Sequence, residues 1–161
     1  MAVVKKLGFF ERLLKRAPER TSTVIVCRSA SELFQAVERA KVSRGRALVL
    51  TSREVPTPSL VHASREVPVV AADSPDEALP LLEALRLSLE PGFYEASARL
   101  IKRRDRERAL SELERVASSV VGEWPAVIAV YPPSWPELRV TGVLGVRAEG
   151  VCGVLALKRV V

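Results

Sequence analysis

The sequence is poor in the residues that build metal and cofactor sites. It has one histidine, His62, and two cysteines, Cys27 and Cys152. These residues are too far apart for any standard zinc or iron–sulfur ligand spacing, so we expect no metal site. The chain has no G-x-G-x-x-G or Walker A sequence, and its three aspartates form no nuclease-style acidic pair. These absences favour a binding protein without a cofactor over an enzyme.

Long apolar stretches are missing as well. Runs such as Val151–Leu157 stay far below the roughly 20 residues that a membrane-spanning helix needs. Near the amino terminus, Glu11 and Arg12 interrupt the apolar run that follows Lys5 and Lys6, which argues against a signal peptide. We therefore expect a cytoplasmic protein with no membrane span.

Thermolabile amides are nearly absent, because the chain has no asparagine and Gln35 is its only glutamine. Arginine outnumbers lysine by 19 to 6, and the formal net charge is +6. This composition favours a thermophilic, archaeal source, with a GC-rich genome as the alternative explanation. The length and the 48% content of hydrophobic residues are typical of one globular domain, which we place at residues 21–161. Residues 1–20 are predicted to form a basic amphipathic helix, because apolar residues recur there every three or four positions.

Short apolar runs alternate with amphipathic helices in the first ninety residues. The runs at Thr23–Cys27, Arg46–Leu50 and Val67–Ala72 each end in small polar residues. Helical periodicity follows two of them, over Ala30–Lys41 and Pro75–Leu89. This alternation predicts parallel strands with helical crossovers. The expected fold is a small three-layer α/β sandwich with a mixed, mainly parallel sheet.

Both helices are expected to begin with a capping box. The spacing of Ser29 with Glu32, and of Ser74 with Glu77, places a hydroxyl and a carboxylate three residues apart directly after a strand. The periodicity of the first helix predicts a buried face made of Leu33, Phe34, Val37 and Ala40.

The second half of the chain is predicted to be a helical stretch followed by strands. Phe93–Val121 is rich in helix-forming residues, and we expect one long helix or two helices there. Ala126–Tyr131 is a predicted buried strand. The alternation in Leu138–Arg147 and the reversal before Val151–Lys158 predict a carboxyl-terminal antiparallel hairpin. We expect this hairpin to add an antiparallel edge to the parallel sheet.

The ends of the predicted parallel strands form a first candidate site. They meet at one edge of the sheet, near helix amino termini whose N–H groups and dipole favour an anion. Arg28 or Arg53 would grip a phosphate or carboxylate there, and Cys27 would have a lowered pKa. The simpler interpretation is that Ser29 and Ser74 only cap helices and that Cys27 belongs to the core. The candidate ligand-binding residues are Cys27, Arg28, Ser29, Arg53, Asp73 and Ser74.

A dense run of charge between residues 99 and 108 is the second candidate site. It contains six cations and only two carboxylates. On a helix, Arg99, Arg103 and Arg106 would share one face with Lys102 beside them, which would match successive phosphates of a nucleic acid. The alternative is a solvated helix stabilised by its own ion pairs. Because the last predicted strands carry no exposed aromatic residues, any nucleic-acid contact would read the backbone and not the bases.

The leading hypothesis is therefore a non-catalytic protein that contacts the backbone of RNA or DNA, or a nucleoprotein partner. The contact would use Arg99–Arg108 and the basic segment Lys5–Arg20. One alternative is a small domain that binds an anionic ligand, or acts on one, at the carboxyl ends of its strands. Another is a homo-oligomeric scaffold, in which the first helix and the last hairpin form a homodimer.

Overall fold

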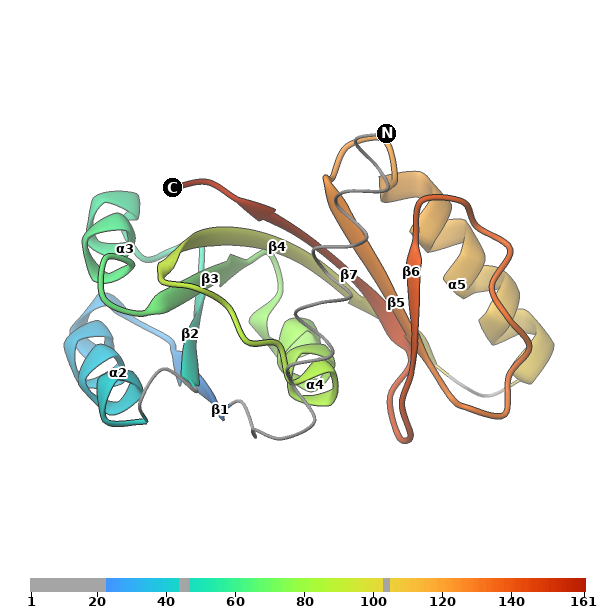
Figure 1. Ribbon diagram of the computed structural model, residues 1–161, viewed down its shortest axis with the longest axis horizontal. Helices are drawn as coiled ribbons and strands as arrows, with labels where there is room; N and C mark the ends of the chain where they lie inside the picture. The colour runs from blue at the N-terminus through green and yellow to red at the C-terminus, as the bar shows by residue number, and fades with distance from the viewer. Residues whose placement is uncertain (1–22, 44–46, 103–104) are drawn as a thin grey trace.

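The computed structural model describes residues 23–43, 47–102 and 105–161 of the chain (Figure 1). The basic amphipathic helix predicted for residues 1–20 lies outside the described residues, and so does Arg103 of the candidate nucleic-acid-binding set. In the part of the chain that the structure describes, no helix has the length and apolar character to cross a membrane.

The described residues form four helices and one seven-stranded sheet. The helices are α2 (Ala30–Val42), α3 (Thr57–Ala63), α4 (Pro75–Leu85) and α5 (Arg106–Val120). The strands are β1 (Thr23–Cys27), β2 (Ala47–Ser52), β3 (Pro68–Ala72), β4 (Gly92–Leu100), β5 (Ala126–Tyr131), β6 (Leu144–Arg147) and β7 (Gly153–Arg159).

The sheet has the order β1-β2-β3-β4-β7-β5-β6. Strands β1 to β4 are parallel to their neighbours, β7 is antiparallel to both β4 and β5, and β5 is parallel to β6. The predicted α/β class with a mixed, mainly parallel sheet is confirmed. Six of the strands therefore end at the same edge of the sheet, which we call the carboxyl edge.

The antiparallel pairing expected near the carboxyl terminus is present, but its partners differ from those expected. Strand β7 pairs with β4 and β5, not with the preceding strand β6, so it lies inside the sheet. Burial explains the difference, because five consecutive residues from Gly153 to Leu157 are buried, as a strand covered on both faces requires. The short β6 is half-exposed in alternation, which suits the edge position that it occupies.

The largest departure from the sequence-based prediction is strand β4. The helical prediction began at Phe93, yet Gly92–Leu100 is a strand that pairs with β3 on one side and β7 on the other. Its alanine, glutamate and arginine residues favour helices, but pairing on both sides overrides that local preference. The predicted helix exists only as α5, which begins at Arg106 after the N-cap residue Asp105. Arg99 and Arg106 therefore do not share one helix face.

Helices cover both faces of the sheet (Figure 1). Helices α2 and α3 pack on one face of β1, β2 and β3, and α5 packs on the same face of β5 and β7. Helix α4 covers the opposite face and closes the largest apolar cluster. The buried face of α2 includes Leu33, Val37 and Ala40 as predicted, but Phe34 is 74% exposed.

Candidate functional site

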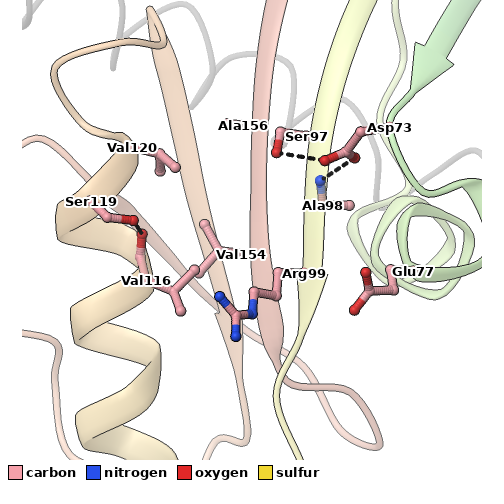
Figure 2. A pocket seen from close by; sticks show the side chains of 10 residues that line it. All are labelled: Asp73, Glu77, Ser97, Ala98, Arg99, Val116, Ser119, Val120, Val154 and Ala156. Carbon is pink, nitrogen blue, oxygen red and sulfur yellow. Dashed lines mark hydrogen bonds between the residues drawn. The ribbon is translucent and has the colours of Figure 1, made fainter. Parts of the chain in front are cut away.

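A polar cleft opens on the sheet face between the two groups of helices. It has a volume of about 330 Å³, and we call it the β4 cleft because residues of that strand form its floor. Helix α5 borders it on one side, and the end of β3 with the first turn of α4 borders it on the other (Figure 2). Its lining residues are Asp73, Glu77, Ser97, Ala98, Arg99, Val116, Ser119, Val120, Val154 and Ala156.

The cleft exists because β4 is amphipathic although it lies in the middle of the sheet. On the face covered by α4, its residues are apolar and belong to the large core cluster. On the other face, Phe93 packs under α3, but Glu95, Ser97 and Arg99 follow at every second position and no helix covers them fully. Central strands of such sheets are usually apolar on both faces, so this polar stripe is a candidate functional surface.

Two carboxylates occupy the place of a missing strand beside β4. Strand β3 ends at Ala72, so the N–H groups of Ala98 and Leu100 have no strand partner there. The Oδ1 atom of Asp73 accepts the N–H of Ala98 at 3.1 Å, and Oε1 of Glu77 accepts the N–H of Leu100 at 3.1 Å. Both carboxylates are thereby held in fixed positions at the rim of the cleft.

These bonds also explain why the predicted capping boxes do not form. Ser29 and Ser74 are the N-cap residues of α2 and α4, as expected, but neither side chain caps its helix. The carboxylate of Glu77 is turned towards β4, and that of Glu32 accepts the N–H of Arg28 at 2.9 Å. In both helices, the glutamate carboxylate therefore accepts a backbone N–H other than that of the N-cap residue.

The environment of Cys27 differs from the one expected for an activated thiol. Its side chain is buried, and its Sγ atom donates to the carbonyl oxygen of Ser29 at 3.1 Å. Burial raises the pKa of Cys27, which opposes the lowering expected near a helix amino terminus. This environment agrees with the simpler interpretation, in which Cys27 belongs to the core. Cys152 is likewise buried, in a different apolar cluster.

The other residues of the strand-end set lie at separate points of the carboxyl edge. Arg28 forms an exposed ion pair of 3.6 Å with Asp76 at the start of α4. Arg53 lines a different, smaller pocket of about 140 Å³. Of these residues, only Asp73 lines the β4 cleft, whose lining also includes Arg99 from the other candidate set.

The cations of the second set lie on a strand, a turn and a helix. Arg99 extends from β4 towards α5, where its guanidinium is 3.9 Å from Glu112 and its side chain is 55% exposed (Figure 2). Lys102 is exposed in the connection that follows. Arg106, in the first turn of α5, is exposed and donates to the carbonyl oxygen of Ser134 at 3.0 Å.

Sequence reasoning missed Glu77, Ser97 and Ser119 as cleft residues. The signal for Ser97 was present, because polar and apolar residues alternate strictly from Tyr94 to Arg99. Ser119 had no such signal, since its place at the cleft depends on how α5 crosses the sheet. The aromatic residues Tyr131 and Trp135 are buried in the α5 cluster and offer no stacking surface.

Within residues 23–43, 47–102 and 105–161, no group of three or more histidine, cysteine, aspartate or glutamate side chains is arranged to hold a metal ion. The polar side-chain groups that line the β4 cleft are one guanidinium, two fixed carboxylates and two hydroxyls. Comparison of the chain with protein-family models, curated proteins and solved structures finds no match.

Proposed function

We propose that the protein binds the backbone of RNA or DNA through the cations around the end of β4 and the start of α5. The observation that carries this proposal is the exposure of Arg99, Lys102 and Arg106, at the end of β4, in the connection that follows and at the start of α5. Phosphate groups bind clusters of exposed cations with little need for other chemistry. Arg103 belongs to the same segment of sequence and lies outside the described residues.

The ion pairs of these cations are long and exposed. Arg99 is 3.9 Å from Glu112, and Arg108, which is 90% exposed, is 3.9 Å from Asp105. Exposed pairs of this kind contribute roughly 0–1 kcal/mol, so they do not prevent contact with a phosphate. Within the described part of the chain, Lys102 forms no ion pair.

The carboxylate of Asp105, which lies within this basic segment, has a structural role of its own. Asp105 is the N-cap of α5, and its Oδ1 atom accepts the N–H groups of Glu107 and Arg108 at 3.0 and 3.5 Å. Its presence in the basic segment is explained by helix capping, which typically stabilises a helix by about 1 kcal/mol. The carboxylate therefore does not argue against a phosphate-binding surface.

Other cations lie at the same edge of the sheet. Arg28, Arg53 and Arg147 lie at or just beyond the ends of β1, β2 and β6, which run in the same direction as β4. All three are exposed. Exposed guanidinium groups at this edge would attract an anionic polymer.

Binding of short, labelled, single-stranded oligonucleotides, measured by fluorescence anisotropy over a range of salt concentrations, tests the proposal. We expect the double variant Arg99→Ala/Arg106→Ala to weaken binding about tenfold or more at low salt. The slope of log K against log salt should also decrease by about 1.4, since each lost phosphate contact removes about 0.7.

The matched control is the double variant Arg39→Ala/Arg65→Ala, which removes the same charge from exposed positions in α2 and after α3. This variant should bind almost as well as the natural chain. Equal weakening by both variants would show a response to net charge alone and would contradict the proposal. Absence of binding by the natural chain at low salt would also overturn it.

A further inference from the structure

The β4 cleft is more elaborate than backbone binding requires. Phosphate contacts need only exposed cations, yet here a guanidinium shares a cavity of about 330 Å³ with two carboxylates and two hydroxyls. Carboxylates repel phosphate, so a ligand that binds both to them and to Arg99 needs a group that donates hydrogen bonds. A sugar hydroxyl adjacent to a phosphate is such a group.

The two carboxylates have free capacity to accept hydrogen bonds. A carboxylate offers about four acceptor positions. Asp73 uses three, because Oδ1 accepts the N–H groups of Ser74 and Ala98 and Oδ2 accepts the hydroxyl of Ser97. Glu77 uses one, and its Oε2 atom accepts no hydrogen bond from the described residues.

The arrangement of these groups separates an anion-binding part from a hydroxyl-binding part. In Figure 2, Asp73 and Glu77 lie to one side of β4, next to β3 and the start of α4. Arg99 extends to the other side of β4, towards α5. A ligand lying across β4 would place a negative group on Arg99 and a hydroxyl-bearing group on the carboxylates. Because backbone N–H groups fix both carboxylates, little ordering is needed when a hydroxyl binds.

We propose that the β4 cleft accepts a ribose of the bound nucleic acid, with the 2′-hydroxyl donating to Oε2 of Glu77 and the adjoining phosphate on Arg99. This inference rests on the proposed function and narrows it from nucleic acid to RNA. The 2′-hydroxyl is the group by which proteins distinguish RNA from DNA at one site. A hydrogen bond to a charged acceptor makes RNA bind about tenfold more tightly than DNA of the same sequence.

The test compares three single-stranded oligonucleotides of one sequence by fluorescence anisotropy at low salt: RNA, DNA and 2′-O-methyl RNA. The methylated strand keeps the ribose but cannot donate from the 2′ oxygen. We expect it to bind like DNA, about tenfold more weakly than RNA. If no strand binds, the proposed function fails. If all three bind equally, the ribose inference fails and the backbone-binding function stands.

The variant Glu77→Gln adds a second readout. It removes a charge but keeps an oxygen for the N–H of Leu100, and a thermal melt verifies its folding. We expect RNA to bind several-fold more weakly and DNA slightly more tightly, since a repulsive charge is lost. A carboxylate that only repelled phosphate would give equal gains for both polymers, and that result would overturn the inference.

Discussion

The side chain of Asp73 continues the hydrogen-bond ladder of β4, because its Oδ1 atom accepts the backbone N–H of Ala98 at 3.1 Å. The last backbone bond between β3 and β4 runs from the N–H of Asp73 to the carbonyl oxygen of Ala96. One residue thus ends the main-chain pairing and begins the side-chain pairing that replaces it. The same carboxylate is both part of the sheet and part of the cleft wall.

We expect Asp73→Ala to lower the free energy of unfolding by about 1–3 kcal/mol, because it leaves the N–H of Ala98 without its partner. Urea unfolding followed by circular dichroism measures the loss. The control is Asp76→Ala, which removes a carboxylate that is 85% exposed and should change stability by less than about 0.5 kcal/mol. Similar losses in the two variants would contradict the role given to Asp73.

The buried thiol of Cys27 should be chemically slow in the folded protein. Its pKa is raised by burial, so little thiolate is present at neutral pH. We expect iodoacetamide at pH 7 to modify Cys27 far more slowly than the unfolded chain, with mass spectrometry locating the adduct. Modification at the same rate in folded and urea-unfolded protein would show that the thiol is accessible and ionised.

The raised pKa of Cys27 also predicts a loss of stability in alkaline solution. The folded pKa lies above the unfolded value, near 9.0, so the protonated thiol favours the folded state. This contribution is fully present below pH 9 and disappears as the pH rises through the folded pKa. Urea midpoints at pH 8 and pH 10 measure it, and Cys27→Ala should reduce the drop. Burial also raises the pKa of Tyr94, so its ionisation in alkaline solution lowers the stability further. The variant Tyr94→Phe should remove this second contribution.

Gly153 is required by the close contact of β7 with β4. A Cβ atom at this position would collide with the carbonyl oxygen of Arg99 and lie 3.2 Å from the Cα atom of Leu100. We expect Gly153→Ala to lower the free energy of unfolding by about 2–3 kcal/mol, measured by urea unfolding. The control is Gly122→Ala, because a Cβ atom at that position lies in open space. Equal stability of the two variants would contradict the close contact described for Gly153.

Neighbouring residues of α2 should respond very differently to substitution. Leu33 is 8% exposed and Phe34 is 74% exposed, in a shallow groove between α2 and α3. We expect Leu33→Ala to cost about 2–4 kcal/mol of unfolding free energy. Phe34→Ser should cost less than about 0.5 kcal/mol. Thermal melts of the two variants compare them, and a larger loss for Phe34→Ser would show that this side chain is buried in solution.

Much of the first half of the fold follows from local patterns in the sequence. Strand β1 and helix α2 agree with prediction within a residue, since each has a clear apolar period and a polar N-cap after the strand. Strand β5 also agrees, because all six residues from Ala126 to Tyr131 are buried and apolar or aromatic. Such elements carry their own signal, so neighbours in space are not needed to recognise them.

The β4 cleft could not be predicted because β4 itself was mistaken for a helix. Its composition favours a helix, and its period of two was the weaker signal until pairing with β3 and β7 was known. Without that strand, Asp73 and Arg99 belonged to two unrelated candidate sites. The wrong partner for β7 has a similar cause, because its pairing with β4 joins residues that are far apart in the chain, such as Leu100 and Gly153.

The position of β7 sets a condition on how the sheet is assembled during synthesis. It is the last strand in chain order, yet it joins β4 to β5. Until residues 153–159 leave the ribosome, the strands made earlier can form only separate pieces, one ending at β4 and one at β5, each with an unpaired edge. Closure of the sheet therefore has to follow the synthesis of β7, and strand–strand association between molecules competes with it until then.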